Sequence, residues 1–364
     1  MPLGSPFSGA NRICPMYRRA QITLVANAVL IGIAAIVVSI ITGKPLIDPE
    51  GSFLGPTWMR LPLLLLGALA LDLVPRTLWD SRFKPQLWRA IAAKRLRTHW
   101  NRERLTLVAL GVVGFYIVYV SYRNLKSALP ALTDHQYDHE LHLIDKALFF
   151  GHEPGAALQA MLGTHVAAWF LSYISLWFLP LVPIAVTCWL VWSKNLSYGY
   201  WFVCAQALAW TLGTISYYAL PTVGPGIQYV QVYAPLAHTP TTDLMNSLVN
   251  ARHTALWDAQ ANAAQTVAGF ASLHVAITLL TALMVQYTVG IKWLRVVFWV
   301  NFACTCVATL YFGWHYVSDD VAGVMIALTA FYLGGIASKQ TFRRKGFAQR
   351  EALQAPPSAK ITTV

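Results

Sequence analysis

The sequence predicts an all-α, polytopic membrane protein, and two observations support this fold class. Hydrophobic residues make up 56% of the 364 residues, whereas charged residues make up only 12%. The apolar residues are also gathered into runs that approach or exceed the roughly 20 helical residues needed to cross a bilayer. We expect about eight transmembrane helices, at residues 20–42, 61–74, 105–122, 166–192, 198–220, 270–289, 295–314 and 321–337.

The basic residues orient these helices, because Lys and Arg accumulate on the cytoplasmic side of membrane proteins. If the N-terminus is inside, 21 of the 27 basic residues lie on that side. Both termini are then cytoplasmic. The formal charge of +12 is therefore a topology signal, and nucleic-acid binding is not expected.

The chain divides into three regions. Residues 1–104 hold two spans and a basic interfacial loop, residues 105–338 form a six-span catalytic core, and residues 339–364 form a polar cytoplasmic tail that we expect to be disordered. The basic segment 76–104 is either an interfacial helix or a loop that orients the chain. Asp72 in the second span is either a functional acid or a group that reaches water at the inner end.

Two short motifs carry the strongest chemical signal. One runs from Phe270 to His274, and the other contains His315 and Asp319. The two histidines are 41 positions apart, which is the length of one helix across the membrane and one back. Both motifs should therefore lie at the outer face. Asp319 follows His315 by four residues, a spacing that lets a carboxylate reach an imidazole on the same helical face.

These residues carry a resemblance to a known family. Ser272-Leu273-His274, followed by His315-x-x-x-Asp319 and Gly323, resembles the second and third motifs of the type 2 phosphatidic acid phosphatase superfamily. Within it, the chain looks most like the branch of inositol-phosphorylceramide synthases, the aureobasidin-resistance-like phosphotransferases. The stretches that suit this branch are residues 137–138, 144–151, 221–225 and 312–316.

The resemblance implies a role for each motif residue. His315 would attack a lipid phosphoryl group to give a phosphohistidine, and Asp319 would hold its ring in one tautomer. His274 would protonate the leaving alcohol. Ser272, near the start of a helix, would hydrogen-bond a phosphoryl oxygen. No metal ion or cofactor is predicted.

The chain also departs from the superfamily pattern. The usual Lys…Arg-Pro first motif is replaced by residues 220–226, and Thr309 stands where an arginine precedes the nucleophilic histidine by six residues. Fewer cations suit a phosphodiester better than a phosphomonoester dianion. The outer-loop cations that could restore charge are Arg123, Lys126, Lys146 and Arg252, of which we favour Arg123 and Arg252.

The predicted function is a membrane phosphotransferase that moves a phosphoryl-linked headgroup from a lipid donor to an alcohol acceptor. The nearest branch suggests a phosphoinositol lipid as donor. A lipid-phosphate phosphatase with the same site is one alternative, and a non-catalytic lipid transporter or scaffold is another. The expected location is a bacterial plasma membrane, with an extracytoplasmic site and a membrane lipid as partner. The oligomeric state stays open.

Structural interpretations of the same residues also stay open. The Ser-x-His triplet could be a helix N-cap followed by an interfacial histidine, and His315 with Asp319 could be a pair that closes a turn. His135, His139 and His142 have a spacing that could chelate a metal ion. Their alternative is an amphipathic helix on the outer headgroups.

Overall fold

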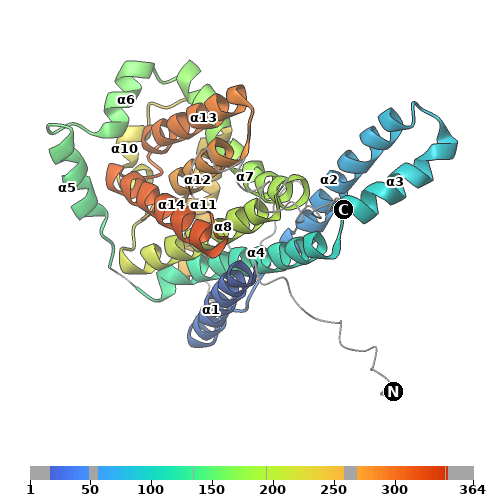
Figure 1. The fold of residues 1–364 in the computed structure, drawn as a ribbon. Helices are drawn as coiled ribbons and strands as arrows, with labels where there is room; N and C mark the ends of the chain where they lie inside the picture. Colours follow the sequence, from blue (N-terminus) through green and yellow to red (C-terminus); the bar gives the residue numbers. More distant parts are fainter. Residues whose placement is uncertain are drawn as a thin grey trace, which may run out of the picture.

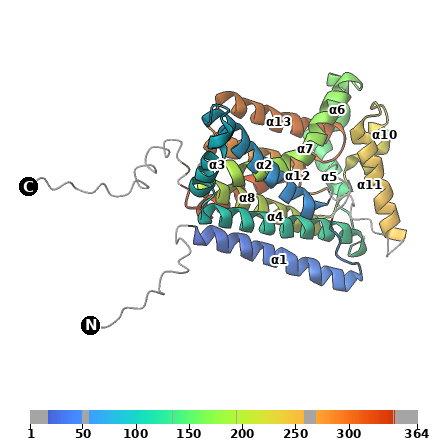
Figure 2. The same ribbon diagram turned by 90° about the vertical axis from the view of Figure 1, so that its right-hand side faces the viewer.

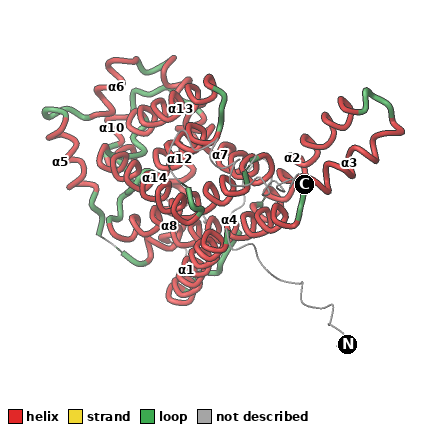
Figure 3. The backbone as a smooth tube through the Cα atoms, viewed as in Figure 1, coloured by secondary structure: helices red, strands yellow, loops and turns green. Residues whose placement is uncertain are grey.

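A computed structural model describes residues 17–48, 56–133, 135–193, 195–257, 269–340 and 342. These residues form helices joined by loops and turns, with no strand among them (Figure 3). The all-α prediction is therefore confirmed.

A helix occurs at each of the eight predicted positions. They are α1 (Arg18–Thr42), α2 (Thr57–Asp80), α4 (Arg102–Ala128), α7 (Val166–Trp192), α8 (Leu196–Ala219), α12 (Leu273–Thr288), α13 (Lys292–Tyr311) and α14 (Val317–Ala337). Within the described part of the chain, six of them are long and apolar enough to cross a membrane, namely α1, α2, α4, α7, α13 and α14. The chain is thus a membrane protein, and the count of eight spans stays a prediction.

The two remaining helices are explained by their surroundings. Helix α12 is apolar but has only 16 residues. Helix α8 lies inside the bundle, where Tyr200, Trp201 and Gln206 are buried among other helices. A helix shielded from lipid by its neighbours can carry a polar side chain such as Gln206.

Shorter helices join the long ones. They are α3 (Pro85–His99), η1 (Leu129–Ala131), α5 (Asp138–Leu148), α6 (Pro154–Leu162), α9 (Pro225–Gln228), α10 (Val230–Tyr233) and α11 (Pro240–Trp257). Figure 2 shows α10 and α11 at one end of the molecule and α3 at the opposite end.

The N-terminal hairpin of α2 and α3 projects from the bundle (Figure 1). The basic segment is thus helical over Pro85–His99, and its contact with headgroups stays a prediction. The Asp72 carboxylate of α2 accepts hydrogen bonds from Arg95 Nε at 3.0 Å and Nη2 at 2.8 Å on α3. This bidentate pair ties the two helices together and gives the intramembrane acid a structural role.

Helix α8 packs on α4 and α14 in the bundle, while α12 packs on α13 and α14 (Figure 1). Helix α1 covers the outer side of α4 and exposes Leu30, Ile40 and Ile41. An apolar helix face without a protein neighbour is the face expected to meet acyl chains.

Candidate active site

The fold brings the two predicted motifs together. His274 is the second residue of α12, and His315 lies in the loop between α13 and α14. The two imidazole centroids are 5.7 Å apart, with an angle of 60° between the rings. One phosphate group placed between them could contact both rings, so this is the candidate active site.

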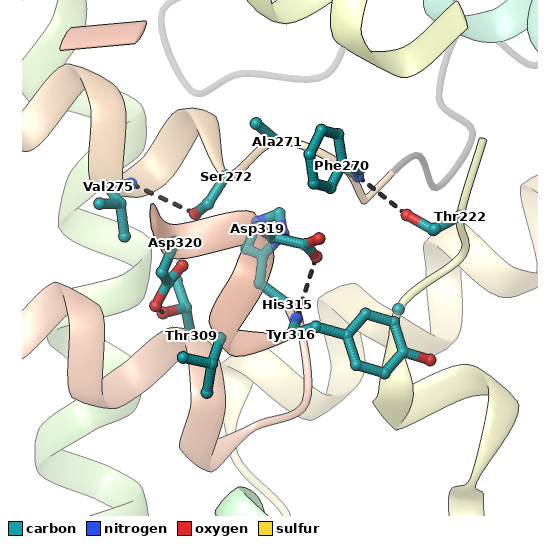
Figure 4. A network of polar contacts seen from close by, with 12 residues as sticks. Thr222, Phe270, Ala271, Ser272, Val275, Thr309, His315, Tyr316, Asp319 and Asp320 are labelled. Carbon is teal, nitrogen blue, oxygen red and sulfur yellow. Dashed lines mark hydrogen bonds and ion pairs between the residues drawn. The ribbon is translucent and has the colours of Figure 1, made fainter. Parts of the chain in front are cut away.

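Asp319 lies beside the His315 ring. Its Oδ2 is 3.4 Å from His315 Nδ1, and the carboxylate is fully buried. The same Oδ2 accepts a hydrogen bond from the Tyr316 N–H at 2.9 Å, which caps the start of α14 (Figure 4). A separation of 3.4 Å is longer than a charge-assisted hydrogen bond. The position of Asp319 fits its predicted role in orienting the imidazole, and that role stays a prediction.

The environment of His315 favours its neutral form. Burial, assisted by the nearby Lys126 ammonium, lowers the pKa of His315 to about 3, against a smaller opposing effect of a hydrogen bond with the Gly269 backbone. A neutral imidazole keeps a lone pair on one nitrogen, which a nucleophile requires.

His274 stands against aromatic side chains. Its ring lies 4.4 Å from that of Phe178 on α7 and 6.3 Å from that of Trp314. These contacts limit the rotation of the imidazole and keep it turned toward His315. A ring held in one orientation fits the predicted role of His274, which is to donate a proton to the leaving alcohol.

A main-chain contact joins the starts of α12 and α14. The Ser272 N–H donates to the Asp319 carbonyl at 2.9 Å. Helix α14 approaches this point closely because Gly323 has no side chain, and a Cβ there would overlap the Ser272 carbonyl oxygen. The glycine eight residues after His315 therefore sets the distance between the two motifs.

The Ser272 hydroxyl is occupied by protein contacts. It accepts a hydrogen bond from the Val275 N–H at 3.4 Å as the N-cap of α12, and it also hydrogen-bonds the Asp320 carboxyl. The residue is fully buried. Its contribution here is to start α12, and its predicted contact with phosphate stays a prediction.

A carboxylate from α5 fixes the turn that replaces the usual first motif. Asp138 accepts hydrogen bonds from the N–H groups of Val223 at 3.0 Å and Gly224 at 2.9 Å. It also accepts from the Tyr316 hydroxyl at 3.0 Å. Gly224 has a φ of 93°, and a Cβ there would lie 2.6 Å from the Trp314 carbonyl oxygen. The turn at 221–224 thus packs directly on the loop that carries His315.

A second acid of α5 holds the start of α14. The Asp145 carboxylate accepts from the Val317 N–H, with both oxygens at 3.1 Å. Burial raises the pKa of Asp145 to about 6. Asp138 and Asp145 lie about two turns apart on the same face of α5. They attach α5 to the turn at 221–224 and to the start of α14. This structural role accounts for both acids in the sequence stretches 137–138 and 144–151.

Sequence reasoning missed Asp320, which follows the predicted Asp319 directly. Its Oδ2 accepts a hydrogen bond from Thr309 Oγ1 at 2.9 Å, and both residues are buried. Thr309 occupies the position of the missing arginine, so the structure has a neutral hydroxyl and a carboxyl where the family pattern has a guanidinium (Figure 4). The only sequence feature that could have indicated Asp320 is the pair of adjacent acids, Asp319 and Asp320, in the first turn of α14.

The candidate cations differ in their surroundings. Lys146 pairs with Glu153 at 3.2 Å on the outer helices, and Arg123 Nη1 donates to the Tyr119 hydroxyl at 3.2 Å. The Arg252 side chain lies outside the described residues. Lys126, which the sequence did not favour, lies within electrostatic range of both His274 and His315.

The outer histidines have other partners. His142 stacks on Tyr229 with 3.9 Å between centroids and lies 3.3 Å from Glu153, while His135 packs on Tyr137. Across the residues that the structure describes, no group of three or more His, Cys, Asp or Glu side chains could hold a metal ion. The contacts of His142 are those of a side chain that attaches α5 to its neighbours.

Comparison with known proteins gives one match. A family model of the PAP2 superfamily matches residues 139–333, which is more than half of the chain and includes both motifs. No curated protein and no solved structure matches. The resemblance to type 2 phosphatidic acid phosphatases is confirmed for the superfamily, while the inositol-phosphorylceramide synthase branch stays a prediction. The chain therefore belongs to the PAP2 superfamily.

Proposed function

We propose that this protein is a lipid phosphotransferase that works through a phosphohistidine on His315. Membership of the PAP2 superfamily supports lipid phosphatase or phosphotransferase chemistry in general. The observation that carries the proposal is the convergence of three side chains: the imidazoles are 5.7 Å apart, and Asp319 lies 3.4 Å from one of them.

The reaction has two steps. In the first, the neutral His315 nitrogen attacks phosphorus, an N–P bond forms, and the P–O bond to the donor lipid breaks. His274 gives its proton to the departing alcohol oxygen. In the second, His274 takes the proton of the acceptor hydroxyl, the acceptor oxygen attacks phosphorus, and the N–P bond breaks. A phosphate anion bound beside His274 stabilises the imidazolium form that the first step needs.

The preference for a phosphodiester follows from the charge of the site. Thr309 and Asp320 supply no positive charge where the family pattern has an arginine. A phosphomonoester dianion needs more compensating cations than a diester with one negative charge. Headgroup transfer uses diesters, so we favour a transferase over a phosphatase. The extracytoplasmic position of the site, inferred from the basic residues, implies that donor and acceptor meet at the outer leaflet of the membrane.

The test is turnover by the purified protein in nanodiscs with a headgroup-labelled phosphodiester lipid and a long-chain alcohol acceptor. We expect label in a new lipid conjugate and its loss by at least about 10³-fold in His315→Ala. Release of the labelled headgroup phosphate to water, without a conjugate, would assign a phosphatase instead. Full turnover by His315→Ala would overturn the phosphohistidine on His315, and no turnover by the wild type with any diester would support a transporter or scaffold.

A further inference from the structure

Helix α5 carries acids on its inner side and apolar side chains on its outer side. Asp138 and Asp145 are buried against the turn at 221–224 and the start of α14, where they accept backbone hydrogen bonds. A helix on a protein surface in water has the reverse arrangement, with its apolar side against the core and its charged side outward. The outer side of α5 therefore indicates an apolar environment around this helix.

The outer side changes from polar to apolar along the helix. His139 and Glu140 are exposed in the first turn. The apolar surface of α5 follows them and consists of four side chains, with these exposed fractions: Leu143 (53%), Ile144 (46%), Leu148 (57%) and Phe150 (94%). A helix with exposed polar groups at one end and exposed hydrocarbon at the other fits the boundary of a bilayer, where its start meets water and its end meets acyl chains.

Phe150 is not accounted for by the turn that holds it. This residue has a φ of 54°, and Gly151 follows with a φ of 90°. The left-handed region is unfavourable for a bulky side chain, and Gly or Asn usually occupies it after a helix. The ring also points away from the protein interior. A phenylalanine in this position gains free energy if the ring enters hydrocarbon.

The apolar surface of α5 adjoins the lipid-facing side of α14. Helix α5 packs on α14 at the edge of the bundle (Figure 1), and Asp145 bonds the N–H of Val317, the first residue of α14. Helix α14 is long and apolar enough to cross a membrane. Its exposed stripe begins one turn after Val317, with the residues Val321, Met325, Leu328 and Tyr332. A bilayer that covers this stripe therefore also reaches the apolar surface of α5.

The basic residue of α5 is paired within the protein. Lys146 Nζ lies 3.2 Å from the Glu153 carboxylate, which belongs to the connection between α5 and α6. A paired charge costs less to bring close to hydrocarbon than an isolated one. The pairing thus removes a charge that would oppose contact with acyl chains.

We propose that the apolar surface of α5 inserts among the acyl chains of the leaflet next to the candidate site. The occupant of this surface is bilayer lipid, and not a second copy of the chain or a soluble protein. Because Asp138 and Asp145 hold two loops of the site, α5 attaches these loops to the membrane surface. The contact does not depend on the reaction that the site performs, so it goes beyond the proposed function.

Photo-crosslinking of the full chain tests this contact. Phe150 is replaced by the photoreactive amino acid p-benzoylphenylalanine, and the protein is irradiated in nanodiscs of palmitoyl-oleoyl phosphatidylglycerol. We expect a phospholipid adduct on the peptide that contains residue 150, in a yield similar to that from the same replacement at Met325 in the α14 stripe. The matched control on the same helix is His139, where the replacement should give no phospholipid adduct.

A second position keeps the test decisive if the Phe150 variant does not fold. The same replacement at Leu148 should also give the phospholipid adduct. Two results would overturn the proposal: no adduct at either position while Met325 gives one, or a crosslink from these positions to a second copy of the chain in place of lipid. Because the measurement needs no turnover, its outcome is independent of whether His315 forms a phosphohistidine.

Discussion

The backbone N–H of Ser272 donates a hydrogen bond to the backbone carbonyl of Asp319 at 2.9 Å. This contact joins the two motifs through main-chain atoms, two residues before His274 and four residues after His315. Because the bond does not involve side chains, a substitution at Asp319 that keeps its shape should leave the distance between the motifs unchanged. Conservative variants therefore test the chemistry of the site rather than its architecture.

The first prediction concerns Asp319. In Asp319→Asn the amide oxygen can still accept from the Tyr316 N–H, so the loop keeps its shape, but the charge that stabilises an imidazolium is gone. We expect kcat/KM for a phosphodiester lipid to fall by about 10² to 10⁴, by analogy with other carboxylate–imidazole pairs. The measurement is steady-state turnover together with thermal unfolding. The exposed Asp80→Asn at the far end of α2 is the control. Wild-type turnover by Asp319→Asn would show that the pair only closes a turn.

The long helices could be predicted from hydropathy where the apolar run was uninterrupted. The predicted range 166–192 coincides with α7, in which Pro180 and Pro183 are tolerated. The second span was predicted at 61–74, whereas α2 covers Thr57–Asp80. The difference arises because Arg60 and Arg76 end the apolar run although the helix continues through them. Hydropathy locates the apolar run of a sequence. It does not locate the first and last hydrogen-bonded residues of the helix that contains this run.

The candidate site could be predicted only in part. The proximity of His274, His315 and Asp319 could be predicted because the spacing of two spans and one helical turn is visible in the chain. The sequence favoured Arg123 as a site cation, whereas the charge that lowers the pKa of His315 is that of Lys126, three residues away. At about 100° per residue their side chains diverge by roughly 60° around α4. Which of them faces the histidines depends on how α4 packs on α8, and a single sequence does not contain that rotation.

The second prediction concerns the close approach of α14 to α12. In Gly323→Ala the new Cβ would overlap the Ser272 carbonyl oxygen, a backbone atom that cannot move without shifting the start of α12. We expect a loss of about 1–3 kcal/mol in stability, the cost of overpacking, and a larger loss of turnover because the imidazoles separate. Thermal unfolding in detergent measures the first effect. The matched control is Gly67→Ala in α2, where a Cβ meets nothing within 4 Å. Equal unfolding temperatures for the two variants would contradict this account.

The third prediction concerns Asp145 and pH. Burial raises the pKa of Asp145 from 3.8 to about 6, so the folded state holds this proton more tightly than the unfolded state. The stability that this group contributes is complete below about pH 4 and is lost as the pH rises through about 6. Asp145→Asn has no proton to lose, and its amide oxygen can still accept from the Val317 N–H.

The unfolding temperature of Asp145→Asn should therefore equal that of the wild type near pH 4 and exceed it at pH 7. The exposed Asp243→Asn on α11 serves as the control and should follow the wild type throughout. Scanning calorimetry at several pH values measures the difference between variant and wild type. A difference that stays constant with pH would mean that burial does not govern this carboxyl.

The last prediction concerns the acid limb of the pH profile, which is the fall of kcat/KM as the pH is lowered. Burial and the Lys126 ammonium lower the pKa of His315 to about 3, so its nucleophilic neutral form persists well below the ordinary histidine value of 6.5. Because kcat/KM reports the free enzyme, we expect no loss of kcat/KM through His315 protonation between pH 7 and pH 5. Lys126→Met removes a charge that opposes the imidazolium, so the acid limb should move to higher pH, while Lys146→Met should leave it in place. An acid limb centred near pH 6.5 in the wild type, with the protein still folded, would mean that His315 is exposed to water and lacks the environment that makes it a nucleophile.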